Sequence, residues 1–524
     1  MKMTSMKEEN ESLLKNDDSS ADEKDEETSI RPLRKWLLWK NIKFFVIPVE
    51  LSAFFYLFTI YFQMQFYQQY FYQRIMKQEI LDFNNISNEQ DDWYFENDST
   101  CLNQDAITNM SSQATFLKGQ KEVNHLNMIS TLISLSLSVV TSLFLIPYSD
   151  VYGRKPFIAI VFVGQAAATV VSIFIVYFKL NMYYFCLTSA INGISGGFGV
   201  ILSSAAAYVT DITPPRWLTI RMAIVSSMIF VGGAAGSPAA DKWIDANGCD
   251  FHPMVWLILA SFLCGLLYTV ILLPESLSKD IKSKNHQTSR NGFRSLVQGI
   301  KIFTSLSYVD ASTLIKLWII NAIIVLVMTD ETGGVQIISY FLHNKPLEWG
   351  YTLIGNYLAV SSVAHILVLF IILPLMVLAK ISDPIIMSVG IVFVLVGDLC
   401  IATFVSKTWE MFLVGIIISM EALISPSIKS YITRLVKKED LGATFSVVAA
   451  LQLIGTIIAT VVFNEIYTPE TTESVNSLSH SPRLVYWVSA ALWGAGLILS
   501  LVLVFFRKKK IVSREKEVTK EPIQ

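Results

Sequence analysis

Twelve long apolar runs, separated by polar links, constrain the fold of this chain of 524 residues more than any other feature. Each run supplies the ~20 residues that a helix needs to cross a bilayer. Backbone groups in lipid must bond to one another, so the runs predict an all-α polytopic membrane protein. Charged residues make up 16% of the chain, against roughly 25% in soluble domains. The predicted spans are 44–66, 124–148, 157–178, 182–206, 217–240, 254–274, 312–341, 350–378, 383–405, 409–433, 441–463 and 484–506.

Basic residues predict the orientation of these spans. Lys and Arg gather at the two ends of the apolar region and at alternate links, including the pair Arg154 and Lys155. The positive-inside rule places such links in the cytoplasm, together with both termini. A polar stretch divides the spans into two sets of six, which predicts two pseudo-symmetric bundles around a midplane site. The expected parts are a disordered acidic tail at 1–43, a bundle at 44–274, a cytoplasmic linker at 275–311, a bundle at 312–506 and a tail at 507–524.

The link at 67–122 is long and acidic, and the same alternation of sides places it outside. It holds three N-x-[ST] sequons, which begin at Asn85, Asn97 and Asn109. Single sequons arise by chance, but three in the one loop that charge already places outside predict a glycosylated loop.

Two further features concern the compartment. Cys101 and Cys249 both fall in predicted outer loops, where an oxidising environment allows a disulfide, and their pairing is left open. Near the N-terminus, the string 9–14 fits an acidic dileucine sorting signal, with Leu13 and Leu14 as contacts for an endocytic adaptor. Such strings also arise by chance, so the plasma membrane and the endosomal or lysosomal membrane both remain open.

Composition and motifs also exclude some functions. No basic patch with interleaved aromatic residues is present outside short loops, which argues against a nucleic-acid partner. The chain contains no H-E-x-x-H, Walker loop or nucleophile elbow, so we do not expect an enzyme, a cofactor or a metal. The expected partners are membrane lipid and a small molecule.

The link between the second and third spans has the pattern D-x-x-G-R-K, formed by Asp150, Gly153, Arg154 and Lys155. It resembles the loop that joins helices two and three in the major facilitator superfamily of transporters. The resemblance implies that these residues hold the inner ends of helices together in one state and release them in the other. The simpler alternative is a positive-inside turn with no gating role.

Several other motifs, in this order and spacing, resemble the proton-coupled folate transporter family, solute carrier family 46. The resemblance implies a major facilitator fold that moves organic anions: folates, muropeptides, cyclic dinucleotides or conjugates. In several members this movement is coupled to inward proton flow. The motifs are Gln69-Tyr70-Phe71-Tyr72-Gln73-Arg74, Arg221-Met222-Ala223, Pro426-Ser427-Ile428-Lys429-Ser430, Gly442-Ala443-Thr444-Phe445-Ser446 and Phe463-Asn464-Glu465-Ile466-Tyr467.

Three departures from the family pattern affect this interpretation. Ser226 stands where a strongly proton-coupled member has Glu, and Lys429 stands where the family often has Arg. The outer loop at 346–349 lacks the Cys that this loop can carry in the family. The first departure leaves three readings open: a proton symporter, a uniporter or antiporter, and a non-transporting membrane receptor. The second suggests an altered anion contact, since Arg and Lys are not interchangeable.

Ionisable residues inside spans are costly and usually face a cavity or the bundle interior. Asp330 and Glu331 are adjacent carboxylates whose repulsion favours a proton on one of them, so we expect them to exchange a proton. The alternative is a wet vestibule. The following pair, Gly333 and Gly334, is expected to loosen the helix. His365 is a candidate proton relay, with a hydrogen-bonded packing role as the alternative.

Lys429 is the predicted contact for an anionic substrate. Glu421, eight residues earlier, is ~80° away on an ideal helix, so both would border one cavity, although an ion pair is the alternative. Glu50 in the first span is expected to border the same cavity. Asp211 is expected to pair with Arg216 or Arg221, or to belong to the gate.

Two other sequence features of the spans were weighed. Asp398 lies in helix nine, which is usually peripheral in this fold, and no role is assigned to it. The glycine-rich run at 193–199 is interpreted as close packing within one helix.

Overall fold

Every element of the computed structural model is a helix. The model describes residues 48–83, 113–214, 217–247, 250–277, 310–343, 351–436, 441–467 and 483–518, with single positions 297, 301, 347 and 349. The predictions for Leu13, Leu14, Asn85, Asn97, Cys101, Asn109, Arg216 and Cys249 lie outside these residues.

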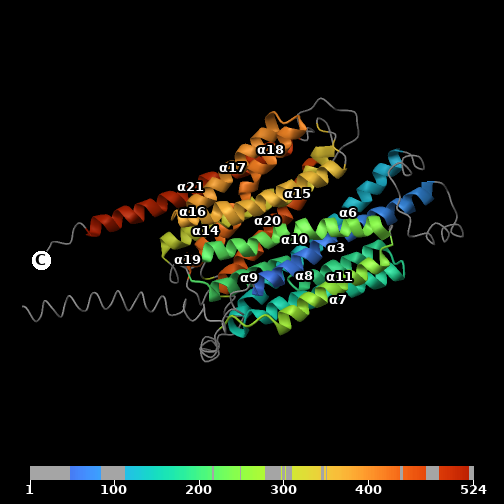
Figure 1. Ribbon diagram of the computed structural model, residues 1–524, viewed down its shortest axis with the longest axis horizontal. Helices are drawn as coiled ribbons and strands as arrows, with labels where there is room; N and C mark the ends of the chain where they lie inside the picture. Colours follow the sequence, from blue (N-terminus) through green and yellow to red (C-terminus); the bar gives the residue numbers. More distant parts are fainter. Residues whose placement is uncertain are drawn as a thin grey trace, which may run out of the picture.

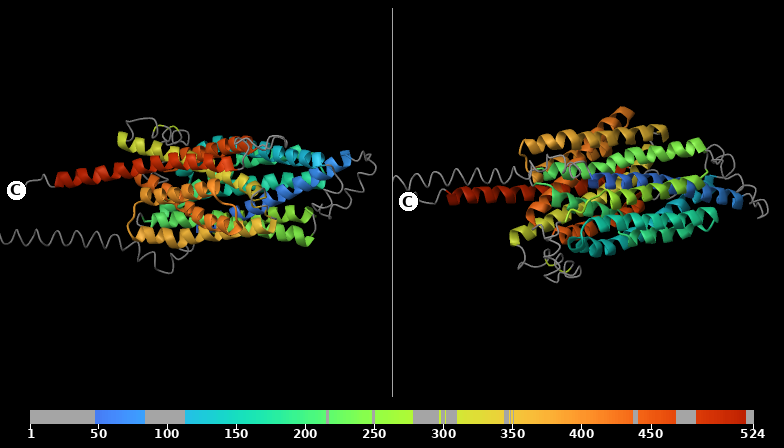
Figure 2. Two further views of the ribbon diagram at one scale, coloured as in Figure 1. Left: turned by 90° about the horizontal axis from the view of Figure 1, so that it is seen from above. Right: turned by 60° about the horizontal axis from the view of Figure 1, so that its bottom comes forward.

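The helices form two bundles that run side by side along the long axis of the molecule (Figures 1 and 2). The N-terminal bundle contains α3 (Pro48–Phe83), α6 (Gln113–Tyr152), α7 (Lys155–Tyr177), η2 (Met182–Tyr184), α8 (Phe185–Ile194), α9 (Gly197–Ile212), α10 (Leu218–Asn247) and α11 (His252–Ile271). The C-terminal bundle contains α14 (Ala311–His343), α15 (Tyr351–Leu367), η3 (Val368–Ile372), α16 (Leu373–Leu378), α17 (Asp383–Thr403), α18 (Thr408–Ile418), η4 (Ser419–Leu423), α19 (Ile424–Leu435), α20 (Leu441–Tyr467) and α21 (Arg483–Val518).

In the described part of the chain, 11 helices are long and apolar enough to cross a membrane. The first predicted span, which contains α3, is not among these helices. Its apolar start at residues 44–47 lies outside the described residues, and the described helix begins only at Pro48. It nevertheless packs along α10 and α11 within the N-terminal bundle. The helix also continues to Phe83, well beyond the predicted end at residue 66, and α6 begins at Gln113, before residue 124. Lys118 of α6 pairs with Glu79 of α3 over 2.9 Å in this shared extension.

The glycine-rich run at 193–199 interrupts the helix, so the prediction of one continuous helix there was wrong. Gly196 and Gly197 have φ values of 84° and 43° and separate α8 from α9. This left-handed backbone is accessible to glycine at little cost, which explains the break. Gly193 also allows close packing, because a Cβ there would lie 2.6 Å from the carbonyl oxygen of Ser134.

In the C-terminal bundle the helices are interrupted in the eighth and tenth spans, and not at the predicted pair Gly333 and Gly334. Gly333 and Gly334 do not loosen α14, which is continuous through both, and Gly333 instead makes room for the ring of Phe463. The eighth span contains the π-helical turn η3, and the tenth contains the 3-10 segment η4. These two irregular segments pack against each other. Mid-helix turns of this kind often mark functional sites or hinges.

The two bundles share one large buried core. The helix α20 packs against α6 and α9, while α10 packs against α15, η3, α16 and α19. Gly199 of α9 would place a Cβ 3.1 Å from Leu453 of α20, so the backbones approach closely there. The bundles are therefore held together mainly by these helix pairs.

Candidate functional site

The clearest connection between the bundles is made by Asp150 in the last turn of α6. Its two carboxylate oxygens accept hydrogen bonds from the backbone N–H groups of Gly442 and Ala443, at 3.2 and 3.0 Å. These two residues lie in the first turn of α20, where free N–H groups and the helix dipole favour an anion. A Cβ at residue 442 would lie 2.5 Å from the carboxylate carbon of Asp150, so only glycine fits. Asp150 therefore caps a helix of the other bundle.

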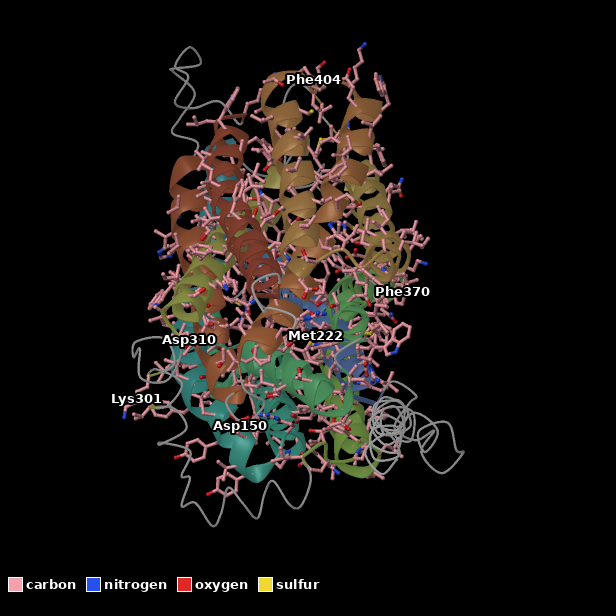
Figure 3. All side chains as sticks on the ribbon, turned by 90° about the vertical axis from the view of Figure 1, so that its left-hand side faces the viewer. Asp150, Met222, Lys301, Asp310, Phe370 and Phe404 are labelled. Atoms are coloured by element: carbon pink, nitrogen blue, oxygen red, sulfur yellow. The ribbon has the colours of Figure 1, made fainter. Side chains whose placement is uncertain are left out.

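Figure 3 looks onto this end of the molecule, which we name the Asp150 end. The labelled residues Asp150 and Met222 lie there between helices of the N-terminal bundle, drawn in teal and green, and helices of the C-terminal bundle, drawn in orange.

Asp150 is held in place by Arg154, which is 1% exposed. The guanidinium pairs with Asp150 over 2.6 Å and with Asp211 over 3.2 Å, and it donates to the Ser149 hydroxyl over 2.6 Å. Burial acts against the charged form of Arg154, but the attraction of the two carboxylates outweighs it and raises the pKa of this side chain. We call Asp150, Arg154, Asp211 and Gly442 the Asp150 network.

These contacts show where the residues of the link between helices two and three lie. Asp211 binds Arg154, whereas Arg221, one of its predicted partners, binds Glu50. The structure thus brings Asp211 into the Asp150 network. Gly153 has a φ of 109°, which permits the sharp turn before α7. Lys155 donates to the carbonyl oxygen of Val270 over 2.7 Å. That bond stays within the N-terminal bundle, so it does not connect the two halves.

A second polar connection between the bundles was not predicted. The Thr219 hydroxyl of α10 donates to Asp383 of α17 over 3.2 Å and lies 2.7 Å from the hydroxyl of Ser430 in α19. Arg434 pairs with Asp383 over 3.1 Å. We call these four residues the Asp383 network. The sequence offered one signal for this network. Asp383 begins the ninth predicted span, and Arg434 stands at the end of the tenth.

Glu50 is 0% exposed and accepts two hydrogen bonds from Arg221, at 2.6 and 3.2 Å. Both of its oxygens are therefore occupied by a residue of its own bundle in this state. The expectation that Glu50 borders a cavity gains no support from this arrangement.

A small pocket lies between α14, α19 and α20, and Lys429 is the one charged residue among the described residues that line it. Lys429 is itself buried, and Glu331 of α14 acts on it electrostatically, although the two do not form an ion pair within 4 Å. Tyr61 of α3 interacts with the same carboxylate from the other bundle. The pocket is lined by Ile324, Val327, Met328, Ser425, Ile428, Lys429, Val448 and Gln452.

Glu421 does not line this pocket, contrary to the prediction that it would share a cavity with Lys429. The ideal-helix angle between them fails because Glu421 lies in the 3-10 segment η4. It interacts instead with Asp330, Glu331 and Asp398. Its Oε1 atom is buried without a hydrogen-bond partner in the described structure.

Asp330 lies among these acids and is 7% exposed. Trp493 of α21 donates to its Oδ2 over 2.6 Å, while Oδ1 has no hydrogen-bond partner among the described residues. The predicted pair Asp330 and Glu331 is thus accompanied by two further carboxylates, Glu421 and Asp398. Sequence reasoning assigned no role to Asp398, although an acid in an apolar span was the signal.

His365 lies where α15 meets α10. Its ring stacks on Phe230 with a centroid distance of 4.5 Å, and Nδ1 lies 2.7 Å from the carbonyl oxygen of Ser361. In this geometry His365 forms a packing contact between the two bundles. Ser226, also in α10, has a buried hydroxyl that bonds to no other described group.

Comparisons with known proteins agree with this architecture. The family model of the Major Facilitator Superfamily matches residues 106–329 and 311–523. The crystal structure of the human organic anion transporter MFSD10 superposes with a TM-score of 0.62, covering 87% of this chain and 98% of that chain at 14% identity. The proton:xylose symporter XylE superposes with a TM-score of 0.58, covering 88% and 95% at 13% identity.

Three curated relatives refine the comparison. The proton-coupled folate transporter of Rattus norvegicus is 29% identical over 61% of this chain and 67% of that protein. The human lysosomal proton-coupled steroid conjugate and bile acid symporter SLC46A3 is 23% identical over 66% and 74%. The probable peptidoglycan muropeptide transporter SLC46 of Drosophila melanogaster is 22% identical over 72% of each.

The fold, the connected bundles and these matches define a class: a multi-pass membrane transporter with two six-helix bundles. The chain belongs to the major facilitator superfamily. Within it, the predicted resemblance to solute carrier family 46 is confirmed by its relatives.

Proposed function

We propose that this protein is a proton-coupled symporter of organic anions, and that the observation that carries this is the buried cation Lys429 in the pocket. A buried ammonium group is costly unless an anion compensates it. In the present state Glu331 is the carboxylate that acts on Lys429 electrostatically. A substrate carboxylate, phosphate or sulfate entering the pocket would replace Glu331 as the partner of Lys429.

This exchange gives a reason for proton coupling. Glu331 can release Lys429 to the substrate at low cost only if it becomes neutral by taking up a proton. Proton uptake and anion binding would then favour each other, which is the thermodynamic basis of symport. The names of the relatives, which are proton-coupled transporters of folate or of steroid conjugates and bile acids, support the same proposal.

Alternating access supplies the movement. In this proposal the Asp150 end faces the cytoplasm, because basic residues gather near it and the positive-inside rule favours that side for them. The state described here, with the Asp150 and Asp383 networks formed, is then closed to the cytoplasm. Release of substrate would require both networks to open, as in the rocking of one bundle against the other.

Uptake of a labelled panel tests the proposal. The panel contains a folate, a muropeptide, a steroid conjugate and a cyclic dinucleotide, offered at about pH 5.5 and about pH 7.5, a range in which carboxylate and imidazole switches respond. Cells would carry the chain with Leu13 and Leu14 changed to Ala, to favour surface display. We expect uptake of at least one anion that is larger at acid pH and collapses with a protonophore.

Variants of Lys429 identify the site. Loss of a charged hydrogen bond of about 1.5–3 kcal/mol predicts that Lys429→Met lowers kcat/KM about 10- to 150-fold. Lys429→Arg should keep more activity than Lys429→Met. Absence of uptake of every compound, with surface expression confirmed, would instead favour a membrane receptor, which a thermal-shift series with the same ligands would detect.

A uniporter or antiporter is the second candidate, and Ser226 favours it. This position carries Glu in strongly proton-coupled members of the family that the chain resembles, and here it carries a hydroxyl. Uptake that does not change with outer pH or with a protonophore would decide for this alternative.

A further inference from the structure

Asp398 is the buried acid that the proposed exchange between Glu331 and Lys429 does not use. It lies in the second half of α17, near its C-terminal end, and is 5% exposed. Its Oδ2 atom has no hydrogen-bond partner in the part of the chain that the structure describes. An ionised carboxylate in such a place is unfavourable, and a structural role would call for a donor or a cation beside it.

The groups around Asp398 are mostly acids. Asp330 of α14, Glu421 of η4 and Tyr357 of α15 are the titratable groups that interact with it electrostatically. The Oδ2 atom of Asp330 accepts from Trp493 of α21, and its Oδ1 atom has no hydrogen-bond partner among the described residues. Unpartnered buried oxygens thus lie on three different carboxyl groups, contributed by three different elements.

The buried acids Asp330, Glu421 and Asp398 have more negative charge than the nearby cation can neutralise. Glu331 adds a fourth carboxylate, from α14, and it interacts with both Asp330 and Lys429. Lys429 of α19 is the cation that acts on this cluster, and it acts through Glu331 rather than through Asp398. Four carboxylates and one ammonium cannot all be ionised in a buried site, because like charges repel and burial disfavours each charge.

Protonation lessens this cost. A protonated carboxyl group is neutral, so each proton bound removes one negative charge from the buried acids. The proton is the ligand that we assign.

We propose that Asp398, together with Asp330 and Glu421, forms a proton-binding site inside the C-terminal bundle, in addition to Glu331 at the pocket. This inference rests on the proposed function and deepens it, because it names the carboxyl groups that hold the transported proton. Asp398 lies on α17, away from the helices that line the pocket. A proton bound to Asp398 is therefore held inside the bundle and not at the substrate pocket.

The 3-10 segment η4 would link this site to the substrate. It carries Glu421 and continues directly into α19, which carries Lys429 at the pocket and Ser430 in the Asp383 network. A change of charge on Glu421 alters the packing of a segment that already departs from α-helical geometry, and such segments act as hinges. Proton binding would thereby reach both the anion contact and one connection between the bundles.

Asp398→Asn tests the site with little change of shape. Asn resembles a permanently protonated Asp, so net proton-driven uptake should fall about tenfold or more, within the usual range of coupling effects. Exchange of labelled for unlabelled substrate needs no net proton movement, so it should stay within about twofold of wild type. Asp398→Glu should restore part of the response to pH. Asp310→Asn is the control, since Asp310 is an exposed acid at the start of the helix that carries Asp330.

The outcomes separate this inference from the proposed function. If wild type moves no anion, the proposed function fails first. If wild type shows acid-stimulated uptake and Asp398→Asn shows the same pH profile at equal surface expression, the site proposed here is wrong. Loss of exchange in parallel with net uptake, with no rescue by Asp398→Glu, would assign Asp398 a structural role. Each assay is repeated with sodium replaced by choline, and uptake that then disappears would identify a sodium site instead.

Discussion

Gly442→Ala isolates the contact between Asp150 and α20. The added Cβ would lie 2.5 Å from the carboxylate carbon of Asp150, so the carboxylate must leave the two N–H groups that it accepts from. Each hydrogen bond to a charged group contributes about 1.5–3 kcal/mol, and part of this is recovered from water. We therefore expect the closed Asp150 end to lose about 2–3 kcal/mol, which corresponds to a shift of about 30- to 150-fold in the equilibrium between states.

Distances between spin labels on the two bundles measure this shift. Tyr152 at the end of α6 and Leu378 at the end of α16 are exposed positions at the Asp150 end, on opposite bundles. In a background without the 5 native cysteines, labels there should show a longer distance in Gly442→Ala than in wild type. Gly494→Ala is the matched control, because a Cβ there meets nothing within 4 Å.

Helix propensity acts in the opposite direction to the expected effect. Alanine stabilises a helix by up to about 1 kcal/mol relative to glycine, so Gly442→Ala should strengthen α20 itself. An opening of the Asp150 end therefore cannot be attributed to a weakened helix. If the distance distribution of Gly442→Ala matches that of Gly494→Ala, the carboxylate does not hold the bundles together and the argument fails.

Three further outcomes are expected. The pKa of Arg154 is raised in the folded protein. A group with a raised pKa contributes stability at every pH below its ordinary pKa, which for arginine is above about 12. The label distances should therefore not change between about pH 5.5 and about pH 8 in substrate-free protein. Thr219→Val removes one hydroxyl of the Asp383 network, so the closed state should lose about 1 kcal/mol, measured with the same labels, while Thr219→Ser should resemble wild type. His365→Phe keeps the stack on Phe230, so uptake should retain its pH profile, and a flattened profile would restore the proton-relay role.

Much of the fold follows from the sequence because lipid imposes a simple rule on it. A span must be apolar and about 20 residues long, so eleven of the predicted spans appear as helices or helix series with the required hydropathy. The helix α3 shows the limit of this rule. It continues to Phe83 and packs along α6, α10 and α11, and hydropathy cannot locate the end of a helix that packs on protein.

The glycines show why local chemistry alone was insufficient. Gly196 and Gly197 interrupt a span, whereas Gly333 and Gly334 lie in a continuous helix. Both pairs have the same intrinsic freedom, so the difference comes from the neighbours. Gly333 is held against the ring of Phe463, a contact between distant parts of the chain that no local window contains. The Asp383 network escaped prediction for the same reason, since Thr219 and Asp383 are separated by more than a hundred residues.

Two consecutive residues of α19 connect the pocket with the contact between the bundles. Lys429 lines the pocket and Ser430 bonds to Thr219 of the other bundle, and the two side chains lie about 100° apart around the helix. A rotation of α19 that moves Lys429 toward an anion must therefore also move the Ser430 hydroxyl relative to Thr219. Because η4 lies directly before α19, this rotation can be absorbed there without unfolding a regular helix. The proposed anion site and the Asp383 network are thus joined through one short helix, as expected of a transporter in which the loaded pocket determines which end of the molecule opens.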